Sequence, residues 1–332
     1  MIIHLKKDIA DEKAASLGQS MEAIHFKSGD QNILVTAAKV KELPKEAAPH
    51  TDEFFPMESD IQLASKTYKD GKRSIQLGKN SIGGDSNNTM LIAGPCSIES
   101  WDQITEVAEV LKKNNITTLR AGCFKPRTSP YTFQGLGEEG IKMLVEVRKQ
   151  YGFNIITEVK DSSHVDLVIE NADIVQIGAK AMYDQSILRR CGESRKPILL
   201  KRGFGTTLQE FVQAAEFILS GGNENVILCE RGIRTFETKT RFTLDLCGVA
   251  FLKEHTNLPI VVDPSHAMGY RYGVADLTRA SVAMGVEGLL IECHPTPDKA
   301  KSDAAQQLNL SEFQQMFDTL QPIASAIGRK MI

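Results

Sequence analysis

Apolar and polar positions alternate regularly from Met90 to the end of the chain. Short apolar runs are separated there by amphipathic stretches with helical spacing, such as residues 101–114 and 207–222. The runs occupy residues 90–93, 118–121, 154–157, 173–177, 197–200, 225–228, 259–262 and 288–291. Strands that alternate with helices build parallel sheets, and eight such strands close a TIM barrel. The pattern therefore predicts an α/β chain with a (β/α)8 barrel over residues 90–332.

The first part of the chain has a different pattern, in which short strands dominate. We expect a strand, a helix, two strands joined at a turn, a short helix and a last strand, at residues 1–7, 8–19, 22–40, 41–48 and 60–68. This order is that of a ferredoxin-like α+β module. It predicts a small ferredoxin-like domain over residues 1–70, followed by a hairpin and linker over residues 71–89 that cap the barrel.

Composition places the chain among ordinary globular proteins. Hydrophobic residues make up 42% and charged residues 24%, and the formal net charge is only −3. That charge gives no reason to expect nucleic acid or an anionic membrane as a partner. The N-terminus lacks the layout of a signal peptide, and no apolar run has the roughly 20 residues that span a bilayer. A cytoplasmic protein is the expectation. The six cysteines form no CxxC pair, so most of them are expected to be buried small hydrophobes.

Polar and ionisable residues follow each apolar run, at the end of a barrel where TIM-barrel active sites lie. The cations among them are Arg120, Lys125, Arg127, Lys180, Lys201, Arg202 and Arg231. Any one of them alone is typical of a solvated loop. Together in one mouth they would repel each other unless anions were bound there. The pattern indicates an enzyme that binds at least two phosphate-sized anions.

A second group at the strand ends has the chemistry of metal ligands. Taken singly, Cys96 is typical of a packed thiol, His266 of a packed or functional imidazole, and Asp303 of a helix cap. Together with Glu292 they form a plausible divalent-metal set, and the thiolate and imidazole favour Mn, Fe, Co or Zn over calcium. Glu158 and Asp263, also at strand ends, are candidate general bases or residues that orient ligands.

Seven segments in order resemble one known family. They are GPCSIES, KPRTSPYTFQGLGEEG, QIGAKAM, LLKRGFGTT, CERGIRTFE, VVDPSHAMGYR and IECHPTPDKAKSD. The resemblance is to 3-deoxy-D-arabino-heptulosonate 7-phosphate synthase, in its short type with an N-terminal ferredoxin-like regulatory domain. It implies the condensation of phosphoenolpyruvate with erythrose 4-phosphate, the first step of the shikimate pathway. It further implies a homotetramer and feedback inhibition by tyrosine or phenylalanine.

The resemblance also implies roles for individual residues. The metal ligands would be Cys96, His266, Glu292 and Asp303. Phosphoenolpyruvate would be held by Arg120, Lys125, Lys180, Lys201 and Arg231, and erythrose 4-phosphate by Lys125, Pro126, Arg127, Thr128 and Ser129. The catalytic residues would be Lys125, which faces the reacting centre, with His266, Asp263 and Glu158. The family usually has arginine where this chain has Lys180, which keeps the charge but loses the bidentate fork.

Three alternatives remain beside this interpretation. The first is 3-deoxy-D-manno-octulosonate 8-phosphate synthase, which uses arabinose 5-phosphate; the KPRTS segment and the extra N-terminal module argue against it. The second is a non-catalytic amino-acid sensor built on a barrel that has lost its activity. Such a loss should have removed the metal set or the KPRTS loop, and both are intact in the sequence. The third, a fused chorismate mutase, would be all-helical, and the first 70 residues are rich in predicted strands.

Overall fold

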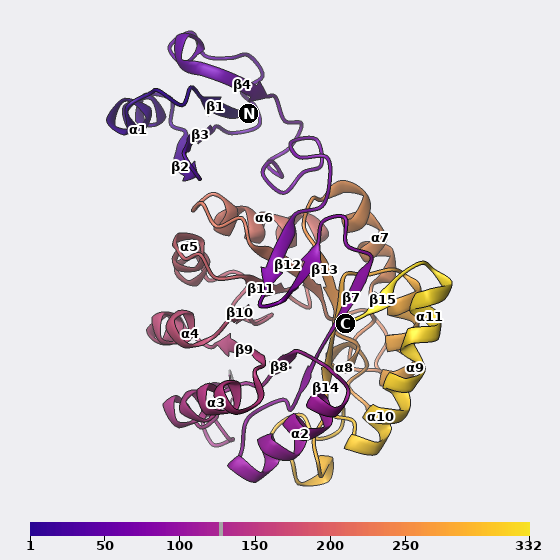
Figure 1. Cartoon of the computed structure of the whole chain (residues 1–332). Helices are drawn as coiled ribbons and strands as arrows, with labels where there is room; N and C mark the ends of the chain where they lie inside the picture. Colours follow the sequence, from indigo (N-terminus) through magenta and orange to yellow (C-terminus); the bar gives the residue numbers. More distant parts are fainter. Residues whose placement is uncertain (126–128) are drawn as a thin grey trace.

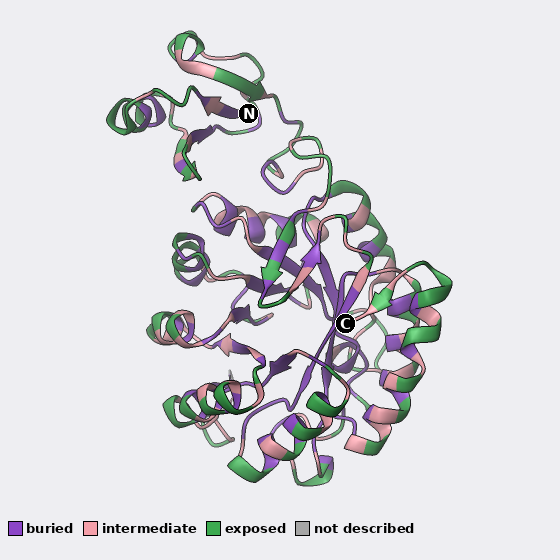
Figure 2. Cartoon of the chain, viewed as in Figure 1, coloured by how far each residue is buried: buried purple, intermediate pink, exposed green. Residues whose placement is uncertain are grey.

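The computed structural model describes residues 1–125 and 129–332, and its larger part is a closed barrel of parallel strands (Figure 1). The sheet closes where β14 pairs with β7, Gly288 lying opposite Met90. All eight predicted strands are confirmed, as β7 (Asn88–Gly94), β8 (Thr118–Arg120), β9 (Asn154–Val159), β10 (Ile174–Ile177), β11 (Ile198–Lys201), β12 (Val226–Glu230), β13 (Ile260–Val262) and β14 (Gly288–Glu292). Figure 2 shows these strands as the buried centre of the molecule. Strands covered on both faces can be apolar throughout, which explains the continuous runs in the sequence.

Helices surround the barrel and begin at recognisable caps. Ser100 caps the first of them, and the capping boxes Thr207–Glu210 and Asn309–Glu312 open two others. The helices are α2 (Trp101–Lys113), α3 (Glu138–Tyr151), α4 (Val165–Asn171), α5 (Gln185–Glu193), α6 (Leu208–Leu219), α7 (Leu246–His255), α8 (Pro264–Met268), α9 (Arg271–Ala283), α10 (Leu310–Asp318) and α11 (Leu320–Ala326). A last short strand, β15 (Lys330–Met331), adds to the start of β7. No helix in the described part of the chain is long and apolar enough to cross a membrane.

A hairpin closes the N-terminal end of the barrel. Its strands, β5 (Ser74–Leu77) and β6 (Asn80–Gly83), lie where the sequence predicts them. Ile75, Leu77 and Ile82 are buried in one cluster with inward-facing residues of the barrel strands, among them Met90, Ile92, Ile156, Leu199 and Leu290. The barrel interior is therefore sealed at this end, and its opposite end, where the strands finish, remains as the mouth.

The N-terminal module is a four-stranded antiparallel sheet with strand order β2-β3-β1-β4. Its elements are β1 (Ile2–Leu5), α1 (Asp11–Ser20), β2 (Ile24–Ser28), β3 (Gln31–Val35) and β4 (Thr51–Phe55). This strand order is that of a ferredoxin-like fold, as predicted. Ile3 and Leu34 face α1, whereas Ile2 and Ile33 face the barrel cluster, because side chains alternate along a strand.

Two details predicted for this module are wrong. Residues 41–48 form turns rather than a helix, and only a short 3₁₀ turn, Ala48–His50, follows; Pro44 and Pro49 lack the N–H that a helix interior needs. The last strand is β4 rather than residues 60–68. β4 pairs with β1, Phe55 lying opposite Ile2, while Leu63 and Ala64 of the 60–68 segment are buried against the barrel.

The module and the segment that follows it contact the C-terminal half of α6 and the residues after this helix (Figure 1). Glu216 on α6 accepts hydrogen bonds from three successive backbone N–H groups, of Gln62, Leu63 and Ala64, over 2.8–3.1 Å. Ser28 of the module donates to Glu224 over 3.1 Å. The carboxylate of Glu216 therefore anchors the segment that joins the module to the barrel.

Candidate active site

The short helix α8 positions the first site residues. The sequence DPSHAMG supplies each signal for it: Asp263 as the N-cap, proline at the first helical position, and Gly269, with a left-handed φ of 73°, at the end. Asp263 Oδ1 accepts from the backbone N–H of His266 over 2.9 Å, and Asp263 Oδ2 lies 2.7 Å from Nδ1 of the same residue. Nε2 of His266 is therefore left to face the mouth.

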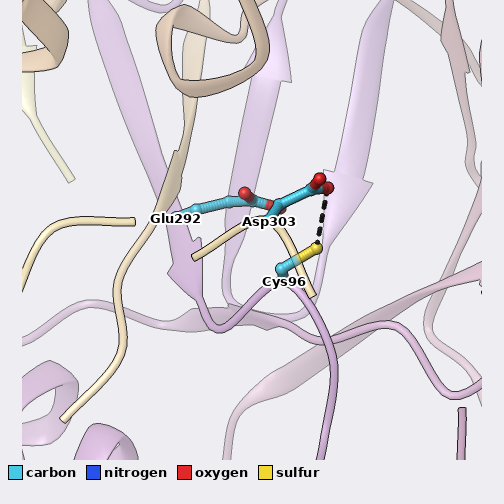
Figure 3. A group of neighbouring side chains, drawn as sticks. All are labelled: Cys96, Glu292 and Asp303. Carbon is cyan, nitrogen blue, oxygen red and sulfur yellow. Dashed lines mark hydrogen bonds between the residues drawn. The ribbon is translucent and has the colours of Figure 1, made fainter. Parts of the chain in front are cut away.

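Cys96, Glu292 and Asp303 converge in one cluster (Figure 3). One ligand atom of each lies within 4.8 Å of the others, and His266 Nε2 lies 3.6 Å from Glu292 Oε1 and 3.9 Å from Asp303 Oδ2. The Cys96 thiol donates to Asp303 Oδ2 over 3.2 Å. Asp303 has a left-handed φ of 49° and caps no helix, so the capping interpretation of this residue does not apply.

This donor set fits a divalent transition ion. Sulfur, imidazole nitrogen and two carboxylates are the ligands that such ions prefer, and their atoms lie close enough together to be shared by a single ion. His266 is oriented by a carboxylate on its other nitrogen, as is usual for imidazole ligands of metals. Burial, followed by Glu292, raises the pKa of Cys96 to about 12, so an ion must displace the thiol proton.

Two buried cations hold these ligands. Arg120, at the end of β8, donates through Nη1 to Glu292 Oε1 over 2.8 Å and to Pro95 O over 2.7 Å. Burial alone would raise the pKa of Glu292, but His266 and Arg120 outweigh it and hold the pKa below its ordinary value. Lys125 Nζ lies 3.1 Å from Cys96 Sγ and donates to Cys96 O over the same distance.

A cavity of about 280 Å³ opens next to this cluster. Its walls carry the cations Lys125, Lys180, Lys201, Arg231 and Arg241, with Glu158, His266 and Asp303. Arg231 is 4% exposed and stacks its guanidinium 4.4 Å from the Phe242 ring centre. Within the described residues its Nε has no hydrogen-bond partner and no carboxylate lies within 4.0 Å of it. A buried guanidinium without a paired carboxylate is well suited to bind an anion.

Two carboxylates complete the cavity region. Asp263 Oδ2 accepts from Lys201 Nζ over 2.5 Å, and His266 and Lys201 hold the pKa of Asp263 well below its ordinary value despite burial. Glu158 accepts from Gln176 Nε2 over 2.8 Å. Gly178 makes room for it, since a Cβ there would lie 2.0 Å from Glu158 Oε1. Lys180 is exposed on the cavity rim.

Most of the predicted site residues are brought together at the mouth, and two described ones, Arg202 and Ser129, are not. Arg202 follows β11 as predicted but turns away from the cavity, because it pairs with Glu230 over 2.9 Å and with Asp245 over 2.8 Å. Pro126, Arg127 and Thr128 lie outside the described residues. Ser129 is described; its hydroxyl accepts from Tyr131 N–H over 3.3 Å and it does not line the cavity.

The structure adds residues that the sequence did not single out. Phe204, inside the LLKRGFGTT segment, and Arg241 and Phe242, outside all seven quoted segments, also line the cavity. Gln306 donates to Glu292 Oε2, and Gln307 bridges Cys96 N–H and Ser302 O. Two adjacent glutamines in a loop give no signal in a single sequence, because Glu292 and Cys96 lie far from them along the chain or in another element.

These features define a TIM-barrel enzyme whose mouth joins a candidate metal cluster to a cationic cavity. The sequence model of the DAHP synthetase I family matches residues 63–328. The chain therefore belongs to the DAHP synthetase I family and is a transferase-type aldolase.

Known relatives agree with this assignment. The phospho-2-dehydro-3-deoxyheptonate aldolase of Thermotoga maritima is 43% identical over 270 residues, which cover 81% of this chain and 79% of that protein. The crystal structure of the Thermotoga maritima DAHP synthase superposes with a TM-score of 0.80 and 36% identity, covering 100% of this chain and 99% of that one. A 2-dehydro-3-deoxyphosphooctonate aldolase of Stenotrophomonas maltophilia is 32% identical over 72% of this chain and 92% of its own length.

Proposed function

We propose that the chain condenses phosphoenolpyruvate with erythrose 4-phosphate to 3-deoxy-D-arabino-heptulosonate 7-phosphate and inorganic phosphate, in a metal-dependent reaction. The observation that carries the proposal is the cavity of about 280 Å³, in which five cations face the Cys96, Glu292 and Asp303 cluster. The 43% sequence identity to the phospho-2-dehydro-3-deoxyheptonate aldolase of Thermotoga maritima supports the same reaction.

The cavity cations suit the charge of the substrates. Phosphoenolpyruvate carries a phosphate and a carboxylate, which match Arg231 with Lys180 and Lys201 on the cavity wall. Arg120 donates hydrogen bonds to Glu292 and to Pro95 O, next to the ligand cluster. We therefore assign Arg120 to the end of phosphoenolpyruvate that lies nearest to this cluster. The predicted erythrose 4-phosphate site in the 125–129 segment remains a proposal from sequence, since Pro126, Arg127 and Thr128 lie outside the described residues.

The residues around the reacting carbons have distinct tasks. C3 of phosphoenolpyruvate attacks the aldehyde carbon, water adds at C2, and phosphate leaves with cleavage of the C–O bond. Lys125, whose pKa is raised because Cys96 and Glu158 outweigh burial, is a charged donor that delivers a proton to the aldehyde oxygen. Glu158 lines the cavity and is the candidate base for the attacking water. Asp263 orients His266 and neutralises Lys201.

A divalent metal held by Cys96, His266, Glu292 and Asp303 would supply Lewis-acid polarisation of the acceptor carbonyl. The donor set favours Mn, Fe, Co or Zn.

The test is phosphoenolpyruvate consumption by the metal-stripped protein, with and without added manganese. Erythrose 4-phosphate and arabinose 5-phosphate are supplied in separate reactions. We expect manganese-dependent consumption with erythrose 4-phosphate alone, and loss of it in Cys96→Ala. Cys191→Ala is the matched control, because this buried thiol on α5 lies outside the site. Full activity of metal-stripped Cys96→Ala would contradict the assignment of a metal site to this cluster.

The second candidate is condensation with arabinose 5-phosphate. It is favoured by the 32% identity to a 2-dehydro-3-deoxyphosphooctonate aldolase. Consumption only with arabinose 5-phosphate would establish it in place of the main proposal. Consumption with neither aldehyde would favour the non-catalytic sensor.

We further propose that residues 1–70 form a regulatory domain, residues 71–89 a cap and residues 90–332 the catalytic domain, in a homo-oligomer, with a homotetramer expected. Tyrosine or phenylalanine would inhibit by binding the module. An amino acid bound between such modules would hold them across the barrel mouth. In this structure the module lies away from the mouth, so that arrangement would require it to leave its contacts near α6, among them the hydrogen bond from Ser28 to Glu224.

Deletion of residues 1–56 tests this regulation. The cut spares residues 60–68, because Leu63, Ala64 and the following segment pack on the barrel. We expect an active enzyme that neither amino acid inhibits. Inhibition that persists after the deletion would place the effector elsewhere.

A further inference from the structure

Gln306 links Glu292 of the ligand cluster to Arg241 in the substrate cavity. Its Nε2 donates to Glu292 Oε2 over 2.6 Å, and its Oε1 accepts from Arg241 Nη1 over 2.7 Å. Gln306 and Glu292 are fully buried, whereas the side chain of Arg241 is 40% exposed and lines the cavity. The three side chains thus form a continuous path from the substrate space to a proposed metal ligand.

The two partners of Gln306 determine the orientation of its amide. A guanidinium can only donate hydrogen bonds and a carboxylate can only accept them. The amide oxygen must therefore face Arg241 and the amide nitrogen must face Glu292. Rotating the amide by half a turn would lose both hydrogen bonds at once.

Glu292 is held from its other side as well. Its Oε1 accepts from Arg120 Nη1 over 2.8 Å, and its backbone N–H donates to Ser265 Oγ over 3.0 Å. The N–H of Gln306 donates to Asp303 O over 3.3 Å, in a turn of the loop that carries both residues. The loop that presents one ligand of the cluster therefore also supplies the group that orients another.

We propose that Gln306 is a positioning residue, which holds Glu292 in the orientation that binds the metal ion and couples this ligand to Arg241 in the substrate cavity. The inference rests on the proposed metal-dependent function and deepens it. Groups that orient metal ligands change metal affinity by about 10–100-fold when they are replaced.

The experiment titrates the metal-stripped, full-length protein with cobalt(II). Ligation by Cys96 gives a thiolate-to-cobalt charge-transfer absorption, which reports both affinity and the presence of the sulfur ligand. Gln306→Met keeps the side-chain length and removes both hydrogen bonds, and Gln306→Glu keeps the shape but places a second carboxylate against Glu292. We expect both variants to bind cobalt about 10–100-fold more weakly and to show the band at saturation.

The matched control is Thr278→Val. It removes a fully buried hydroxyl that donates to Val274 O within α9, away from the site, and should leave cobalt affinity unchanged. Unchanged affinity in Gln306→Met and Gln306→Glu, with both variants folded, would overturn the positioning role. Absence of the charge-transfer band in the unmodified protein would overturn it as well.

A double-mutant cycle tests the coupling to Arg241. Arg241→Met should weaken cobalt binding, and the effect should be smaller in the Gln306→Met background, because the guanidinium acts on Glu292 through the amide. Some effect should remain, since Arg241 also lies 3.6 Å from Asp303 Oδ1. Fully additive effects would overturn the coupling. Failure of the unmodified protein to consume phosphoenolpyruvate would reject the proposed function, while the cobalt titrations would still decide the role of Gln306.

Discussion

Asp263 contacts His266 through both of its carboxylate oxygens. Oδ1 accepts from the backbone N–H over 2.9 Å and Oδ2 lies 2.7 Å from the ring Nδ1. One side chain therefore both begins α8 and sets the direction of the imidazole that α8 carries. The same Oδ2 accepts from Lys201, so the cationic cavity and the ligand cluster share this carboxylate.

Asp263→Asn should reduce turnover by about 10–100-fold. The neutral amide cannot both neutralise Lys201 and accept a hydrogen bond from His266 Nδ1 as the carboxylate does. The melting temperature should also fall, since buried Lys201 loses its counter-charge. Turnover at saturating substrate and thermal denaturation measure the two effects. The control, Asp276→Asn, breaks an exposed ion pair with Arg279 on α9 and should change neither quantity appreciably.

Replacement by methionine should affect the stability of the fold differently at two buried arginines near the mouth. Arg202→Met removes one partner of Glu230 and Asp245 and should destabilise the fold by about 3–5 kcal/mol. Arg231→Met removes a guanidinium whose pKa is lowered by burial and which has no carboxylate partner among the described residues. The ligand-free melting temperature of Arg231→Met should therefore be unchanged or higher.

Inorganic phosphate distinguishes the function of Arg231 from its effect on stability. Phosphate should raise the melting temperature of the unmodified protein, by mass action on the folded state. This protection should disappear in Arg231→Met. A loss of stability in Arg231→Met as large as that in Arg202→Met would contradict its assignment to an anion.

Gly178→Ala should displace Glu158 and lower activity. The added methyl would lie 2.0 Å from Glu158 Oε1, so the carboxylate must move out of the cavity wall. Overpacking of this kind costs about 1–3 kcal/mol of stability. The matched control is Gly205→Ala in the next loop, where nothing lies within 4 Å of the new methyl. Equal turnover rates for Gly178→Ala and Gly205→Ala would show that activity does not depend on the position of Glu158.

The anchor of the module should give the stability a pH dependence. Burial raises the pKa of Glu216 from 4.5 to about 7, although three backbone N–H groups oppose the shift. The folded state therefore holds this proton more tightly than the unfolded chain does. The stability that this group contributes is fully present below about pH 4.5 and is lost as the pH rises to about 7.

Glu216→Gln should remove that contribution. The dependence of the melting temperature on pH between 4.5 and 7 should become flatter than in the unmodified protein. Glu254→Gln, at an exposed carboxylate on α7, is the control and should leave the dependence as it is. An identical pH profile for Glu216→Gln and the unmodified protein would rule out this titration.

Much of the barrel could be predicted because its signals are local. Each apolar run is bounded by polar turns and helical stretches, and covered parallel strands need only continuous apolar residues. The strand ends meet at one mouth whatever the details of packing, so Cys96, Glu158, Asp263 and Glu292 could be assigned to it. The DPSHAMG segment even contains the start and end of its helix.

The last strand of the module could not be predicted in the same way. The sequence pattern predicts a strand at residues 60–68 and none at β4, and only pairing with β1 identifies β4 as the last strand. Leu63 and Ala64 of the 60–68 segment instead pack against barrel residues that lie far away in the sequence.

What the sequence determined by itself was the barrel, the order of its elements and the residues at its mouth, because periodicity and strand direction follow from near neighbours. Tertiary structure decided which of these residues act together. Arg202 and Arg231 both follow a strand, yet one is neutralised by Glu230 and Asp245 and the other faces the cavity. Gln306 gains its position only when its loop meets β14. The direction of a side chain depends on partners from other loops, and these partners meet only in the folded chain.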